Sequence, residues 1–280
     1  MFDDLLLHTT TRMALDAFAT RPPHALLLVG PAGIGKFTVA IAWARHLLQD
    51  AQYAPQVITP DEKGSISIET IRGLYRAVRG KRTEQQVIVI DHAEAMSVEA
   101  ENAFLKLLEE PRQGVTFVLT APHMTAVLPT ILSRAQRVEL QPLDATTMQA
   151  FVSKQRQLSS ADLAQLLFIA EGRPATAVQL LNDETRLNEH RSYMQRAKEL
   201  LTAKPYTRYI TISTLNADRS ACFATLTAML QMVELQLKKN TNPTQVKGLL
   251  IMSENLQETL SLLEKNGNIK AQLLKLFASY

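Results

Sequence analysis

A glycine-rich segment that ends in a lysine is the part of the sequence best suited to chemistry. The segment GPAGIGKF has the spacing G-x-x-x-x-G-K through Gly30, Gly35 and Lys36, with Gly33 as a further glycine inside it. Where such a loop leads into a helix, its successive backbone N–H groups surround phosphate oxygens, and the lysine adds a positive charge. These four residues predict a phosphate-binding loop for a nucleotide such as ATP.

The residue after the lysine does not suit hydrolysis of that nucleotide. Hydrolysis by such loops uses a Ser or Thr hydroxyl at this position to hold Mg²⁺, and the residue here is Phe37. Thr38 follows and is kept among the predicted nucleotide-binding residues. One step along a helix turns the side chain by about 100°, so its hydroxyl is expected to point away from the ion. The loop therefore suits binding of ATP and magnesium better than hydrolysis.

A second set of candidate residues follows the apolar run Val87–Ile90. Asp91 comes directly after this run, at the expected carboxyl end of a parallel strand, where open α/β sheets bind ligands. Its carboxylate is the candidate for contacting magnesium. Active ATPases of this architecture place a glutamate next, to orient the attacking water, and this sequence has His92 instead. Glu94 could substitute for that glutamate, but a solvated loop acid is the interpretation that the sequence favours.

Strands and helices that alternate along the chain must position these residues. Apolar runs predict strands, and helical spacing predicts helices after the glycine loop and before Pro111. The predicted strands are Ala25–Val29, Val87–Ile90, Val115–Thr120 and Gln136–Leu140, and the predicted helices are Lys36–Leu48 and Ser97–Glu110. This alternation indicates an α/β fold with a parallel sheet, which we place at residues 1–143.

The strand pattern stops after Pro142. Residues 144–187 read as short helices with a break near Glu171–Pro174, and we expect them to form a small helical lid. In residues 188–280, leucine and methionine recur at helical spacing, as in Leu226, Met229 and Leu230. Such stripes are typical of helix packing, so this part is predicted to be an all-helical collar that packs with other subunits.

Composition and termini exclude several classes of protein. The chain has 280 residues, a formal net charge of +3 and one cysteine, Cys222. One cysteine excludes an intrachain disulfide and a cysteine-based zinc site, so no zinc is expected. The first residues, MFDD, are acidic where a secretory signal needs basic residues, and no apolar run reaches the roughly 18 residues of a membrane span. We expect a cytoplasmic protein with no membrane contact.

Five cations gather on and just after a helix that is expected to begin near Ile68. They are Arg72, Arg76, Arg79, Lys81 and Arg82. This cluster could contact a DNA backbone without reading its sequence. A solvated basic face explains the same pattern.

Three segments together resemble a known family. They are Ala93–Met96, Ala103–Pro111 (AFLKLLEEP) and Leu128–Arg134 (LPTILSR). They resemble the clamp-loader branch of the AAA+ proteins, and within it the delta prime family of bacterial DNA polymerase III. The resemblance covers about the first 180 residues.

The resemblance implies roles for particular residues. In the family, the arginine of a Ser-Arg-Cys turn reaches the terminal phosphate of ATP held by a neighbouring subunit, and Arg134 matches it within Ser133-Arg134-Ala135. Arg173 resembles a second sensor, an arginine from the helical lid that faces bound phosphate. The first sensor is a polar residue at the end of a strand, where only Thr120 is available. The zinc module that is common in the family is missing.

Three functions are compatible with these features. The favoured one is a non-motor subunit of the DNA polymerase III clamp loader, without an ATPase of its own, which supports ATP-dependent loading of a sliding clamp onto primed DNA during replication. Its partners would be gamma/tau-like and delta-like subunits, the clamp indirectly, and primed DNA weakly. The alternatives are an ATP-hydrolysing gamma/tau-like motor, in which Thr38 and Glu94 compensate, and a different AAA+ assembly protein.

Overall fold

The chain divides into two compact units. A computed structural model describes residues 5–49, 54–79, 85–204, 206, 208, 210, 215, 217–265 and 267–278. The first unit is Met1–Leu181 and the second is Asn182–Tyr280. The finer division predicted from the sequence, into a sheet domain, a lid and a collar, stays a prediction.

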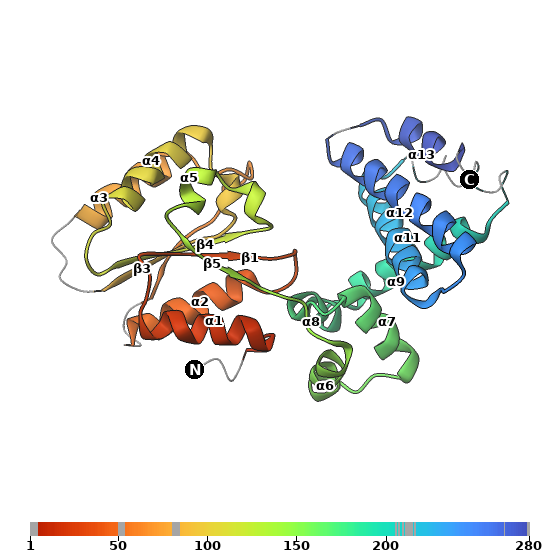
Figure 1. Cartoon of the computed structure of the whole chain (residues 1–280), viewed down its shortest axis with the longest axis horizontal. Coiled ribbons are helices and arrows are strands. Elements are labelled where there is room, and N and C mark those ends of the chain that lie inside the picture. The colour runs from red at the N-terminus through yellow and green to blue at the C-terminus, as the bar shows by residue number, and fades with distance from the viewer. Residues whose placement is uncertain are drawn as a thin grey trace. The chain divides into compact units, whose positions relative to one another are not determined.

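A five-stranded parallel sheet forms the centre of the first unit (Figure 1). Its strand order is β2-β3-β4-β1-β5, and every paired neighbour is parallel. The strands are β1 (Ala25–Val29), β2 (Gln56–Ile58), β3 (Gln86–Ile90), β4 (Val115–Ala121) and β5 (Gln136–Glu139). The predicted α/β fold is therefore confirmed. Because the strands are parallel, their carboxyl ends meet at one edge of the sheet, where the glycine loop and Asp91 both lie.

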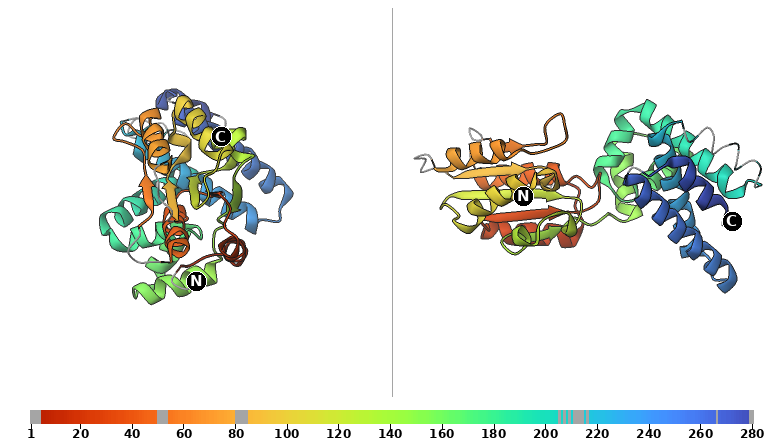
Figure 2. Two further views of the ribbon diagram at one scale, coloured as in Figure 1. Left: turned by 90° about the vertical axis from the view of Figure 1, so that its left-hand side faces the viewer. Right: turned by 90° about the horizontal axis from the view of Figure 1, so that it is seen from above.

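Helices cover both faces of this sheet, as Figures 1 and 2 show. One face carries α1 (Thr9–Thr20) and α2 (Lys36–Leu48), and the other carries α3 (Ile68–Arg79), α4 (Val98–Glu109) and α5 (Pro129–Leu132). Two short 3₁₀ turns, η1 (Ala93–Ala95) and η2 (Met124–Ala126), follow β3 and β4. Both faces are covered, which explains why β1 and β4 are buried along their whole length.

Alternation along β1 divides the core of the first unit into two clusters. Leu26 and Leu28 pack with Trp43 beneath α1 and α2, whereas Leu27 packs with Phe104 beneath α3 and α4. Successive side chains of a strand point to opposite faces, so one apolar strand contributes to both clusters. Helix α4 begins where the Ser97 side chain accepts a hydrogen bond from the Ala100 N–H, and it ends before Pro111.

Three short helices complete the first unit. They are α6 (Ala145–Gln155), α7 (Ser160–Ala170) and α8 (Pro174–Asn182), and the side chains of Asp144 and Ser159 cap the first two. The break between α7 and α8 lies at Glu171 and Gly172, which both have positive φ. A side chain on Gly172 would lie 2.3 Å from the Leu143 carbonyl oxygen, so this sharp turn requires glycine.

The second unit is helical in the part that the structure describes. Its helices are α9 (Glu184–Thr202), α11 (Arg219–Lys239), α12 (Pro243–Glu264) and α13 (Ile269–Ala278). Leu226 and Met229 of the predicted stripe lie in its core with Val233, Leu256 and Leu263, and Leu230 packs against this core. Among the described residues, no helix is both long enough and apolar enough to cross a membrane.

Cys222 provides a test of this second core. The side chain is fully buried, and burial raises the pKa of its thiol to about 11, with a smaller opposing effect of Arg219. At pH 8 about one thiol in a thousand is then ionised, and only the thiolate is nucleophilic. We expect a thiol reagent to modify the folded chain at least about 100-fold more slowly than the chain in denaturant. Equal rates, measured by mass spectrometry, would contradict the buried position.

Candidate functional site

The glycine-rich loop connects β1 to α2, as the sequence predicts. Gly33 and Gly35 have φ values of 77° and 97°, in the left-handed region that favours glycine. Gly35 is the N-cap of α2, and Lys36 is the first residue of that 13-residue helix. The structure thus places the N-terminal N–H groups of a helix at the carboxyl edge of the sheet, which is the geometry of an anion-binding loop.

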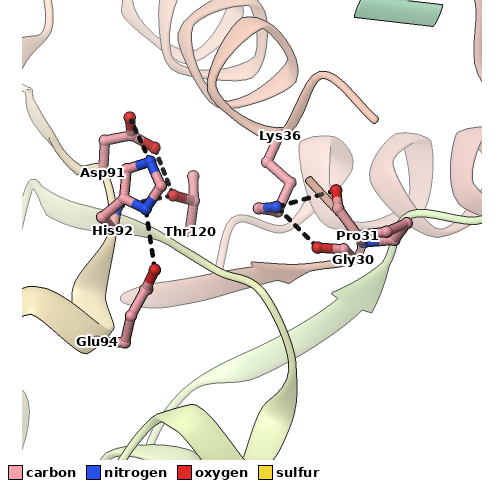
Figure 3. Close-up of polar contacts among 7 residues, drawn as sticks. All are labelled: Gly30, Pro31, Lys36, Asp91, His92, Glu94 and Thr120. Atoms are coloured by element: carbon pink, nitrogen blue, oxygen red, sulfur yellow. Dashed lines mark hydrogen bonds and ion pairs between the residues drawn. The ribbon is translucent and has the colours of Figure 1, made fainter. Parts of the chain in front are cut away.

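Lys36 is directed at the loop itself. Its Nζ donates to the carbonyl oxygen of Gly30 at 2.7 Å and to that of Pro31 at 3.1 Å (Figure 3). Burial lowers the pKa of the Lys36 amine, and the negative charges of Glu94 and Asp91 oppose that shift. These two acids are therefore close enough to act on the lysine electrostatically, although its hydrogen bonds go to the loop.

The predicted residues after β3 form a second polar group, also drawn in Figure 3. The Thr120 hydroxyl donates to Asp91 Oδ1 at 2.5 Å and accepts the His92 N–H at 3.0 Å. His92 Nδ1 lies 2.9 Å from Glu94 Oε1, and His92 has a left-handed backbone with φ 56°. Thr120 therefore joins the ends of the neighbouring strands β3 and β4, and the imidazole of His92 is paired with Glu94.

Phe37 and Asp91 are the residues that bear on a magnesium site around this loop. Phe37 occupies the position of the metal-binding hydroxyl and is 40% exposed. Asp91 accepts the Thr120 hydroxyl through one of its oxygens, Oδ1. The described residues hold no group of three or more His, Cys, Asp or Glu that could bind a metal ion, but magnesium held by phosphates and one carboxylate needs no such group. The predicted roles of Asp91 and Thr38 stay predictions.

Helix α8, in the segment predicted to be a lid, lies against the glycine loop. The Thr176 N–H donates to the Gly33 carbonyl oxygen at 3.1 Å, and a Cβ added to Gly33 would lie 1.9 Å from Thr176 Oγ1. A Cβ added to Gly35 would lie 3.9 Å from the Cβ of Ala175. Sequence reasoning missed both lid residues, because neither Ala175 nor Thr176 has a chemical signature of its own.

A narrow space separates the lid, the loop and the segment before α1. It is lined by Leu7, His8, Ile34, Leu143 and Pro174, among others, and has a volume of about 10 Å³. One water molecule needs about this volume, and a purine base needs far more. The loop itself has the backbone geometry that suits phosphate.

Arg173, predicted as the second sensor, makes its hydrogen bonds within the lid. Its guanidinium donates to the carbonyl oxygens of Ala170 and Ile169, each at 3.0 Å, and to Glu171 Oε2 at 3.1 Å. These bonds satisfy the last carbonyl groups of α7, where a positive charge is favourable. The sensor role of Arg173 stays a prediction, since the lid residues that contact the loop glycines are Ala175 and Thr176.

Arg134, the predicted arginine finger, lies two residues after the end of α5. Its Nη1 donates to the Thr130 carbonyl oxygen at 3.0 Å and to Ser133 Oγ at 3.1 Å. Its Nη2 pairs with Glu109 Oε1 at 2.9 Å, and the side chain is 35% exposed. A guanidinium held in this way presents fixed donors at the surface.

The structure describes only part of the predicted basic cluster. Arg72 and Arg76 are exposed on α3, whereas the side chain of Arg79, together with Lys81 and Arg82, lies outside the described residues. Arg72 and Lys106 line a cavity of about 490 Å³ between α3 and α4, but so does Glu99. The lining is therefore of mixed charge, and DNA contact stays a prediction.

The fold and the loop together define the class of protein. A parallel sheet with a glycine loop after β1 and a helical lid is the architecture of an AAA+ P-loop protein. A gamma subunit-related protein of DNA polymerase III from Thermotoga maritima has a similar fold, with a TM-score of 0.55 and 18% identity over 96% of this chain and 97% of that one. A RuvB variant from the same organism matches 70% of this chain and 66% of that one, with 17% identity and a TM-score of 0.51.

Sequence comparisons add relatives from DNA polymerase III and from replication factor C. The family model described as DNA polymerase III, delta subunit, matches residues 8–144. The DNA polymerase III subunit delta prime of Pseudomonas aeruginosa is 30% identical over 202 residues, 64% of this chain and 61% of that protein. Human replication factor C subunit 5 is 28% identical over 152 residues, 52% of this chain and 44% of that protein. These matches confirm the resemblance to the AAA+ clamp-loader family, with a delta prime subunit among the relatives.

The chain spans about half the length of the first curated relatives that it matches. The matched shares are 49% of mouse replication factor C subunit 5 and 44% of the human protein. The residues that the family model matches, 8–144, hold the five strands of the sheet and the helices on its faces.

Proposed function

We propose that this chain is a non-motor subunit of the DNA polymerase III clamp loader, which supports ATP-dependent loading of the sliding clamp onto primed DNA. One observation carries the proposal: Arg134 is held by three hydrogen bonds at the surface, while the chain's own loop has Phe37 in place of a magnesium-binding hydroxyl. The similarity to subunits of DNA polymerase III supports a role in that complex. The chain would thus assist hydrolysis in a neighbour without hydrolysing ATP itself.

Arg134 would act on ATP that a neighbouring gamma/tau-like subunit holds. Phosphoryl transfer builds charge on the oxygens of the transferred group, and a fixed guanidinium stabilises that charge without having to reorganise. The planar fork of an arginine suits phosphate oxygens better than the point charge of a lysine. The all-helical second unit would supply the collar through which the subunits assemble, with delta-like and gamma/tau-like chains as partners.

Purified chain alone is expected to show no magnesium-dependent ATPase activity. The reasons are the missing hydroxyl at Phe37, the pairing of His92 with Glu94, and the contact of Thr176 with Gly33. Phosphate release would be measured at saturating ATP, with the reconstituted clamp loader as the positive control. Clear turnover that Lys36→Ala abolishes would contradict the proposal and support a gamma/tau-like motor.

A further inference from the structure

Glu109 occupies a position that is electrostatically unfavourable for an acid. It is the last residue of α4, and a second acid, Glu110, follows it. The carboxyl end of a helix carries a partial negative charge, so cations are favoured there and carboxylates are not. A residue that breaks such a local preference is expected to be compensated by a specific contact elsewhere in the fold.

That compensating contact is Arg134. Glu109 Oε1 lies 2.9 Å from Arg134 Nη2, although the two residues are 25 positions apart in the sequence. The other end of the same guanidinium is fixed by Thr130 and Ser133, which both accept from Nη1. A guanidinium has five N–H donors, and these bonds use three of them. Within the part of the chain that the structure describes, the Nε–H and one N–H of Nη2 have no hydrogen-bond partner, and we take them as the donors to the oxygens of a phosphate.

Helix α4 is a firm support for this contact. Its Phe104 and Leu108 lie in the same buried cluster as Ile131 of α5. The carboxylate of the largely buried Glu101 accepts a hydrogen bond from the Leu128 N–H, at the beginning of α5, and burial raises the pKa of that carboxyl. Helix α4 therefore contacts the chain at Leu128, just before α5, and at Arg134, just after it. These contacts hold the backbone of α4 in place, and with it the Glu109 carboxylate that pairs with Arg134.

We infer that Glu109 is the positioning residue for Arg134, holding its guanidinium in the orientation from which it reaches a neighbour's phosphate. This inference rests on the proposed function of Arg134. Without the carboxylate, the guanidinium would keep only the two bonds of Nη1, to Thr130 and Ser133, and would occupy a wider range of orientations. Glu109 does not touch the phosphate itself, so its contribution passes entirely through Arg134.

The test is a double-mutant cycle in the reconstituted clamp loader with primed DNA and ATP. Glu109→Ala is expected to slow hydrolysis about threefold to tenfold at the one site that Arg134 serves, so kcat of the whole DNA-stimulated ATPase should fall by no more than it does with Arg134→Ala. KM for ATP should be unchanged, because the neighbour binds the nucleotide. Glu109→Gln keeps an oxygen acceptor and should retain most of the rate. In the Arg134→Ala background, Glu109→Ala should have no further effect. Glu110→Ala, at the adjacent acid, is the matched control and should leave the rate unchanged.

Each result of the cycle decides the matter. A rate with Glu109→Ala that equals the unmodified rate, or exceeds it, overturns the inference, since an increase would mean that the carboxylate competes with phosphate. The inference is also overturned if Glu109→Ala lowers the ATPase rate by the same factor in the unmodified chain and in the Arg134→Ala background. Glu109 would then act independently of Arg134. If Arg134→Ala alone changes nothing, the proposed function fails; if Arg134→Ala lowers the rate and Glu109→Ala does not, only the inference fails. Thermal melting of each variant checks that the fold is retained.

Discussion

Replacement of Arg134 by alanine is expected to depress the DNA-stimulated ATPase of the reconstituted clamp loader while leaving its assembly intact. An arginine that stabilises a transferring phosphoryl group contributes about 10³-fold or more at the site that it serves. The clamp loader has several ATP sites, and Arg134 would serve one of them. The total ATPase rate should therefore fall by the contribution of that site and of any other site whose activity depends on it. Arg134 is 35% exposed, and among the described residues it bonds to its own α5 turn and to Glu109, so its loss should barely change folding. Steady-state phosphate release and gel filtration measure the two effects separately.

Two further variants make this result specific. Arg134→Lys keeps the charge but loses the planar fork, so it should restore little of the rate. Arg137→Ala removes an exposed arginine three residues along the chain, whose Nη1 lies 3.8 Å from the sulfur of Met124. The clamp loader with this control variant should hydrolyse ATP at the unmodified rate. An unmodified rate for Arg134→Ala, or an equal loss for Arg137→Ala, would sink the assignment of the arginine finger.

The sequence predicts the central fold well because its signals are local. The helix at Lys36–Leu48 has the predicted bounds, and the apolar run at Ala25–Val29 is β1. A covered parallel strand needs a continuous apolar run, which is visible without knowledge of its partners. By contrast, β2 (Gln56–Ile58) was not predicted, since it is a three-residue edge strand with two exposed residues and leaves almost no pattern.

The candidate site is predictable only in part. Glycine spacing reveals the loop, and the match to the family indicates Arg134, because both lie in short continuous motifs. The pairing of Arg134 with Glu109 and the contact of Thr176 with Gly33 depend on tertiary packing between distant segments. Arg173 is an example in which residue type and contacts differ. An arginine suits a phosphate sensor, but the guanidinium of Arg173 bonds to carbonyl oxygens at the end of α7.

Phe104→Ala should cost about 3–5 kcal/mol of the free energy of unfolding of the first unit. Phe104 is fully buried, and its ring packs edge to face on Phe117 with centroids 5.2 Å apart. Removal of the ring leaves a cavity between α4 and β4 and takes away the aromatic pair. Denaturant unfolding followed by circular dichroism would measure the loss. Phe104→Leu fills most of the space and should cost clearly less.

The two units provide an internal control for this prediction. Each unit has a core of its own, and Cys222 is buried in the second, whereas Phe104 is buried in the first. Thiol modification as a function of denaturant therefore reports unfolding of the second unit separately from the loss of the sheet. Phe104→Ala should lower the denaturant midpoint of the first unit and leave the midpoint for modification of Cys222 unchanged. Equal shifts of both midpoints would mean that the two cores unfold as one cooperative unit, and the predicted cost would then apply to the whole chain.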